Sequence, residues 1–187
     1  MQVNFNKIEQ ISTIDYPGKS ACVVFFNGCP WRCGYCHNKQ TWTDINMVDV
    51  GYVKDQIKSC LPFISSVVFS GGDPTMQIEP LRELCKYSKS LNLFVGIETN
   101  GYNPWGMEDI KSFVDVFFVD IKAPINNMND YFTISGRLNA SHRVDLTLHK
   151  NLPIEIRIVD TGNAQKIAKS IKTNHKITIL PYIKRNK

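Results

Sequence analysis

Three cysteines, Cys29, Cys33 and Cys36, lie close together in the run Cys-Pro-Trp-Arg-Cys-Gly-Tyr-Cys, directly after a strongly apolar segment. Three thiolates can bind three irons of a four-iron cluster. The fourth iron then has no protein ligand and is open to a small molecule, which turns an electron-transfer cluster into a site for chemistry. The spacing therefore indicates a reaction centre.

Zinc is the main alternative for these thiols. A zinc site usually takes four Cys or His ligands as two separated pairs, and no second pair follows in this sequence. Cys22 or His37 could serve as the fourth ligand, so the spacing alone leaves zinc open. A disulfide framework is disfavoured, because six cysteines in 187 residues is modest usage and no secretory signal precedes them. We expect reduced, metal-binding thiols.

Length and composition predict one domain over residues 1–187, with residues 1–19 as an N-terminal addition and residues 20–187 as the main fold. The content of 43% hydrophobic and 21% charged residues is typical of a soluble protein, and no apolar stretch could span a bilayer. We therefore expect a cytoplasmic protein with no membrane partner. The net charge is +5, but the lysines are scattered, so no nucleic-acid partner is expected either.

The hydrophobic pattern alternates between strands and helices. Strands are predicted at residues 20–27, 66–70, 93–98, 116–121, 154–159 and 176–180. Helices are predicted at residues 49–60, 79–90, 108–113, 139–150 and 164–171. About six strands separated by helices indicate parallel βαβ units with right-handed connections. Residues 3–13 also have strand character and precede a turn at residues 15–18, so they are predicted to add a strand at the entry to the sheet.

Polar motifs follow each predicted strand at its carboxyl end. In parallel α/β folds this edge carries the active site, because the loops converge there while the strands hold them rigidly. After the first to the fifth strand come, in order, the cysteine run, Gly71-Gly72-Asp73-Pro74, Glu98-Thr99-Asn100-Gly101, Asp120 with Lys122, and Asp160. The sequence therefore predicts one site at this edge.

The motif after the second strand suits an amino-acid amine. Gly71 and Gly72 allow close approach of the backbone to a ligand, and their carbonyls together with Asp73 can accept hydrogen bonds from an ammonium group. A tight turn in which Asp73 is only a cap remains an equal alternative.

Two charged residues belong to apolar strands. Asp120 ends such a run and needs a partner to offset its desolvation. Arg157 either faces inward and pairs with a carboxylate, or lies with Glu155 on the solvent face.

The Cys-x3-Cys-x2-Cys spacing, with Tyr35 before the third cysteine and Gly-Gly-Asp-Pro after the second strand, resembles the radical S-adenosylmethionine (SAM) superfamily. The wider string over residues 26–38 resembles its branch of glycyl radical enzyme activating enzymes. The length and the Gly-Gly-Asp-Pro motif are most similar to the activating proteins of anaerobic ribonucleotide reductases. The Asp-Tyr-Pro-Gly-Lys stretch at residues 15–19 is similar to a subgroup of these activases.

The resemblance implies an α/β fold, an incomplete TIM-like barrel of about six parallel βα units. It implies that Cys29, Cys33 and Cys36 are catalytic and ligate a 4Fe-4S cluster whose open iron binds SAM. The remaining implied SAM-binding residues are spread over the later strand ends and comprise Tyr35 near the adenine, Asn38, the amine-binding Ser70, Gly71 and Gly72 with Asp73 nearby, Thr99, Asn100, Asp120, Lys122 and Arg157.

The resemblance does not decide whether a monovalent cation binds beside SAM. In pyruvate formate-lyase activase, an Asp-Thr-Asn-Gly motif after strand three contributes to a monovalent cation site beside SAM. Here Glu98 stands in place of that Asp, so a cation near Glu98, Thr99 and Asp120 is not assigned. The Val-x-Pro expected after Arg157 is also replaced, by residues 159–162.

The implied activity is reductive cleavage of SAM to a 5′-deoxyadenosyl radical, which takes hydrogen from a glycine of a partner enzyme. The expected partners are a large glycyl radical enzyme, namely anaerobic ribonucleotide reductase, and a flavodoxin or ferredoxin-like electron donor. Two alternatives stay open: a radical SAM enzyme acting on a small molecule such as a pterin-like deazapurine precursor, and a zinc-binding or electron-transfer module that binds no SAM.

Overall fold

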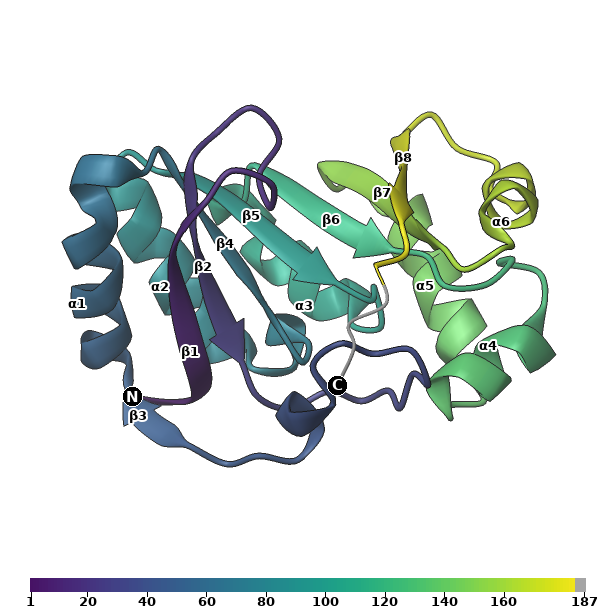
Figure 1. Cartoon of the computed structure of the whole chain (residues 1–187), viewed down its shortest axis with the longest axis horizontal. Coiled ribbons are helices and arrows are strands. Elements are labelled where there is room, and N and C mark those ends of the chain that lie inside the picture. The colour runs from purple at the N-terminus through teal and green to yellow at the C-terminus, as the bar shows by residue number, and fades with distance from the viewer. Residues whose placement is uncertain (184–187) are drawn as a thin grey trace.

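The computed structural model describes residues 1–183, and residues 184–187 at the end of the predicted domain lie outside this range. Its centre is one eight-stranded sheet in the order β3-β1-β2-β4-β5-β6-β7-β8 (Figure 1). The strands are β1 (Gln2–Ser12), β2 (Ala21–Phe26), β3 (Met47–Asp49), β4 (Ser66–Gly71), β5 (Phe94–Thr99), β6 (Val116–Asp120), β7 (Ile154–Asp160) and β8 (Lys176–Pro181). All neighbouring pairs from β2 to β8 are parallel.

The edge strands β3 and β8 do not pair with each other, so the sheet stays open. The fold is therefore the partial barrel predicted from the sequence, with six parallel strands. The predicted N-terminal strand is present as β1, which pairs antiparallel with both β2 and β3. The three-residue strand β3 was not predicted, because so short a segment shows no period of its own.

The helices follow the strands as α1 (Val50–Cys60), α2 (Ile78–Ser90), α3 (Pro104–Ile110), α4 (Met128–Ser135), α5 (Ala140–His149) and α6 (Ala164–Ser170). The longest of these, α2, has 13 residues, and no helix within residues 1–183 is long and apolar enough to cross a membrane.

Two helices differ from the sequence prediction. Helix α3 begins earlier than residue 108, because the Asn103 side chain accepts a hydrogen bond from Gly106 N and Pro104 suits the first helical position. Residues 111–113 form only a 3-10 turn. Helix α4 was not predicted. It is capped by Asn127, which accepts from Asp130 N at 3.0 Å, and it ends at Gly136 with φ +70°.

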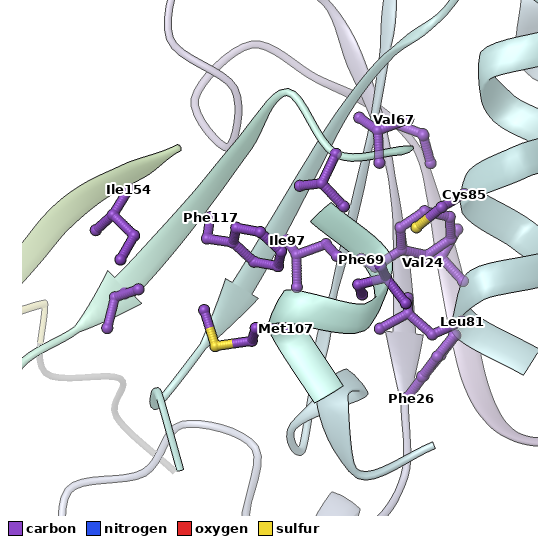
Figure 2. Close-up of a cluster of buried hydrophobic side chains, with 14 of the residues drawn as sticks. Val24, Phe26, Val67, Phe69, Leu81, Cys85, Ile97, Met107, Phe117 and Ile154 are labelled. Atoms are coloured by element: carbon purple, nitrogen blue, oxygen red, sulfur yellow. The ribbon is translucent and has the colours of Figure 1, made fainter. Parts of the chain in front are cut away.

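The main core lies between the sheet and its helices. Figure 2 shows Phe69 of β4 and Ile97 of β5 packed in one cluster with Leu81 of α2 and Met107 of α3. Successive residues of a strand point to opposite faces. Val68 and Phe118 therefore belong to a separate, smaller cluster on the other, inner face of the sheet.

The turn between β1 and β2 covers part of this inner face. Its Tyr16 packs edge-on against Phe118, with ring centroids 5.6 Å apart, and against Phe94 at 6.4 Å. A backbone oxygen of the same turn, on Asp15, accepts a hydrogen bond from Arg157 Nη2 at 2.8 Å. The predicted turn thus links residues far apart in the sequence and closes the inner face at the end away from the cysteines.

The packing of Tyr16 on the sheet depends on Gly96. A Cβ at this position would lie 2.9 Å from Phe118 Cε2 and 3.2 Å from Tyr16 Cδ2. We expect Gly96→Ala to lower the free energy of unfolding by about 1–3 kcal/mol, since both rings are buried and neither can move freely. Urea denaturation of the apoprotein measures this. The control is Gly34→Ala, whose Cβ would meet no atom within 4 Å. Equal stability of the two variants would contradict the described packing.

Candidate active site

A cavity of about 260 Å³ lies at the carboxyl edge of the sheet. It is lined by most of the residues that the sequence singled out: Cys29, Cys33, Tyr35, Cys36, Asn38, Ser70, Gly71, Gly72, Glu98, Thr99, Asn100, Asp120 and Lys122. Three other predicted residues lie elsewhere. Asp73 and Arg157 are buried outside the lining, and Asp160 is exposed at the end of β7.

The three thiols share this cavity but differ in environment. Cys33 is buried, and Cys29 and Cys36 are half-buried. Burial raises the pKa of Cys29 to about 12, and the nearby charge of Asp73 adds to the rise. Burial also raises the pKa of Cys33, against the opposing charge of Lys122. Cys29 and Cys33 are therefore protonated in the free protein, and a bound metal group must stabilise them as thiolates.

The donor set fits an iron–sulfur cluster. Within residues 1–183, no three Cys, His, Asp or Glu side chains gather closely enough to hold a single metal ion. Around a four-iron cluster each thiolate binds a different iron, so the sulfurs surround the group without meeting at one point. Two nitrogen donors already face these sulfurs: Asn38 N lies 3.4 Å from Cys36 Sγ, and Asn100 Nδ2 lies 3.9 Å from Cys29 Sγ.

The glycine turn after β4 lies directly against the cysteine loop. A Cβ at Gly71 would come within 2.2 Å of Phe26 O, and one at Gly72 within 2.2 Å of Gly28 O. Gly71 also has a φ of +115°, a conformation that L side chains rarely adopt. Only glycine permits this contact, which places the backbone of the turn in the cavity wall beside the cysteines.

Asp73 organises the site from behind the wall. Its carboxylate accepts from Thr75 N at 3.0 Å, from Thr99 Oγ1 at 2.9 Å and from Asn100 N at 2.9 Å. It also accepts from the Thr75 hydroxyl. The expectation that Asp73 binds an ammonium group directly does not match this geometry, because its side chain is fully buried and both oxygens are already used. Burial raises the pKa of Asp73, and these hydrogen bonds oppose the rise.

Arg157 faces inward and pairs with a carboxylate, which is the first of the two arrangements that the sequence left open for it. Its Nη1 bonds to Glu98 Oε1, and its guanidinium lies 3.7 Å from the ring centroid of Phe118. Ser70 Oγ donates to the other Glu98 oxygen at 2.6 Å. Glu155, the alternative neighbour, instead binds residues of β8. Arg157 therefore reaches the cavity only through Glu98.

The three side chains considered for a monovalent cation are partly engaged with other groups. Both oxygens of Glu98 are bound to its two partners. The Thr99 hydroxyl donates to Asp73, and Asp120 Oδ2 accepts from Lys122 Nζ at 3.0 Å. A cation would therefore compete with Ser70 and Arg157 for Glu98, and the prediction is left unassigned by this geometry.

Lys122 provides a fixed positive charge. Its side chain is only 15% exposed, pairs with Asp120, and has its Nζ 5.9 Å from the Tyr35 ring centroid. Burial alone would lower the pKa of Lys122, but the neighbouring charge of Asp120 raises it. The amine is therefore protonated and can attract an anionic group in the cavity.

Five further residues line the cavity: His37, which the sequence suggested only as a zinc ligand, and Trp31, Trp42, Val159 and Tyr182, which were missed as site residues. Tyr182 comes directly after β8 and stacks on His37 with ring centroids 5.8 Å apart. The strand-end rule that located the other motifs also applies to Tyr182. No pattern in the sequence distinguishes Trp31 or Trp42 from ordinary core or surface aromatics.

The pH dependence of stability tests the Glu98 environment. Burial raises the pKa of Glu98 to about 6, despite the opposing charge of Arg157. Because the folded-state pKa lies above the ordinary value, Glu98 favours folding most at low pH and loses this contribution as pH rises through 6. Relative to Glu98→Gln, we expect the free energy of unfolding of the native apoprotein to fall by about 2 kcal/mol between pH 4 and pH 7.5.

Urea titrations at several pH values give this difference. Ser70→Ala removes a hydrogen bond to the charged form and is expected to steepen the fall. Parallel pH profiles for the native protein and Glu98→Gln would show that Glu98 ionises normally.

Comparisons with known proteins agree with this geometry. Residues 23–149 match the family model described as the radical SAM superfamily. The chain is 30% identical to a pyruvate formate-lyase-activating enzyme of Clostridium pasteurianum, over 95% of this chain and 81% of that protein. It is 27% identical to the pyruvate formate-lyase 1-activating enzyme of Escherichia coli strain K12, over 95% and 79%.

Solved structures share the fold. QueE from Escherichia coli superposes with a TM-score of 0.58 at 16% identity, covering 97% of this chain and 95% of that one. TYW1 with a lysine-pyruvate adduct bound superposes with a TM-score of 0.65 at 15% identity, covering 88% and 65%. From the family match over residues 23–149 and the relatives that align along almost its whole length, the chain belongs to the radical SAM superfamily.

Proposed function

We propose that this protein is an activase that forms a glycyl radical in a partner enzyme. The reaction class is inferred from one observation: the three cysteines, the glycine turn after β4 and protonated Lys122 all line the same cavity. The activase role is supported by the relatives, which are named as activating enzymes and align with 95% of this chain.

Radical SAM proteins use a 4Fe-4S cluster and SAM, and the donor set described above fits such a cluster. When bound and reduced, a 4Fe-4S cluster would supply the one electron needed to break a carbon–sulfur bond of SAM, giving methionine and a 5′-deoxyadenosyl radical that would take a hydrogen atom from glycine Cα. Cys29, Cys33 and Cys36 would hold the cluster.

The other residues of the cavity bind and orient SAM in this proposal. Backbone carbonyls of residues 70–72 would accept hydrogen bonds from the methionine ammonium group, and Lys122 would attract the carboxylate. Tyr35 would pack near the adenine. Trp42 and Tyr182 would add aromatic walls that help to exclude water. A carbon radical needs such a site, because water must be kept away from reactive intermediates.

The position of Asp73 gives it a supporting role. It holds the end of β5 against the glycine turn through Thr99 and Asn100, so it keeps the amine-binding backbone in place without contacting SAM. A positioning role of this kind contributes to catalysis because small displacements of reacting groups reduce rates strongly.

The partner in this proposal is a large glycyl radical enzyme. The sequence motifs favour anaerobic ribonucleotide reductase as this partner. Pyruvate formate-lyase is an equally good candidate, because the relatives from Clostridium pasteurianum and Escherichia coli are named as its activating enzymes. The open sheet leaves its edge strands β3 and β8 unpaired with each other, so a peptide segment carrying the target glycine has a side through which to approach. A flavodoxin or ferredoxin-like protein would supply the electron.

Anaerobic reconstitution with iron and sulfide, followed by dithionite and SAM, tests the reaction class. We expect 5′-deoxyadenosine by chromatography, and we expect Cys33→Ala to lose both the cluster absorbance and the product. The control is Cys60→Ser, because Cys60 lies at the end of α1, outside the cavity lining, where its thiol bonds to Gln56 O and contacts Ser59 Oγ. Tight zinc binding without SAM cleavage would show that the cysteine run is structural.

Mixing the reduced, SAM-loaded protein with candidate partners tests the activase role. We expect an organic radical signal by electron paramagnetic resonance with either anaerobic ribonucleotide reductase or pyruvate formate-lyase. The signal should disappear when the target glycine of the responding partner is replaced by alanine. Consumption of SAM that requires an added small molecule, with no radical on either partner, would instead favour a small-molecule enzyme.

A further inference from the structure

The indole nitrogen of Trp31 is a buried donor without a partner. Among residues 1–183, only two buried side-chain polar atoms lack a hydrogen bond, Trp31 Nε1 and Tyr131 Oη. Both side chains are fully buried. Trp31 lines the cavity together with the three cysteines, whereas Tyr131 does not. Unpaired buried donors are rare in folded proteins, so each one calls for an explanation.

The surroundings of Trp31 hold its ring in place. The ring packs edge-on against Tyr131, with centroids 6.0 Å apart, and against Tyr102 at 6.4 Å. Its backbone oxygen accepts from Arg32 Nη1 at 2.8 Å, and Arg32 N donates to Ser135 O on α4. These contacts hold the indole against Tyr131 of α4 and keep it out of contact with solvent.

The chemistry of the cavity supplies an acceptor. Indole Nε1–H is a donor only, and leaving it unpaired costs about 1–3 kcal/mol. Trp31 stands midway between Cys29 and Cys33 in the sequence, and all three side chains line the same cavity. Once an iron–sulfur cluster is bound there, its sulfides and the coordinating thiolates are negatively charged acceptors.

We propose that Trp31 Nε1–H donates a hydrogen bond to a sulfur of the cluster bound by Cys29, Cys33 and Cys36. This inference rests on cluster binding in the proposed function but not on the identity of the partner. Hydrogen bonds to sulfur stabilise the more negative, reduced cluster and so raise its reduction potential. Trp31 is thus a positioning residue that sets the potential at which the cluster accepts an electron.

Trp31→Phe removes the N–H while keeping an aromatic ring. In the reconstituted protein without SAM, we expect its cluster potential to shift to more negative values in a redox titration followed by electron paramagnetic resonance. Two controls are expected to leave the potential unchanged. Trp105→Phe alters an exposed tryptophan outside the cavity lining, and Tyr131→Phe removes the other unpaired donor, which also lies outside it.

A second measurement does not depend on the stability of the variant. The native protein is labelled with ¹⁵N in its tryptophan indoles, and electron–nuclear double resonance is recorded on the reduced cluster in H₂O and D₂O. We expect coupling to an exchangeable proton and to one indole nitrogen. Absence of both couplings, or an unchanged potential in Trp31→Phe, would overturn the inference. Neither readout requires SAM cleavage, so failure of the activase proposal remains distinguishable.

Discussion

The buried carboxylate of Asp73 is the interaction on which the site depends. A fully buried charge is costly unless hydrogen bonds compensate it, and here donors from Thr75, Thr99 and Asn100 surround it. These donors come from the turn after β4 and from the end of β5. The carboxylate therefore fixes two neighbouring strand ends relative to each other.

This constraint extends to the cysteine loop through the backbone. Asp73 N donates to Gly28 O at 2.9 Å, and Gly72 N donates to Phe26 O at 2.8 Å. The side chain of Asn100, whose backbone binds Asp73, reaches toward Cys29 Sγ. One buried group thus joins the three segments that carry the cysteines, the glycine turn and the β5 motif, and it does so without facing the cavity.

A second polar network lies on the inner face of the sheet, where a barrel would otherwise pack apolar side chains. Arg157 spans from the β1–β2 turn to Glu98, and Ser70 completes the bonds to that carboxylate. An ion pair of this kind contributes little net stability but specifies one arrangement of its elements. It links the N-terminal turn to the wall of the cavity, and among residues 1–183 it leaves Lys122 as the lysine or arginine that lines this cavity.

Most of the fold could be predicted from the sequence, because mainly apolar runs such as residues 66–70 and 116–121 mark buried parallel strands and lie close to the observed β4 and β6. Short elements such as β3 and α4 could not, since they depend on pairing with β1 or on local caps and have no strong period. The predicted start of α3, at residue 108, was too late in the sequence. The helix begins at Pro104 because its cap, Asn103, lies before the apolar residues that suggested the helix.

The sequence by itself determined which chemical groups the site could offer, because the spacing of the cysteines and the Gly-Gly-Asp-Pro motif are local features that do not depend on the fold. Tertiary structure alone decided which side chains face the cavity. Asp73 and Arg157 carry suitable groups, yet burial and competing partners remove both from the lining. Trp31 and Tyr182 carry no motif, yet packing places them in it. Residue type sets what a group can bind, but only the folded chain sets what remains free to bind.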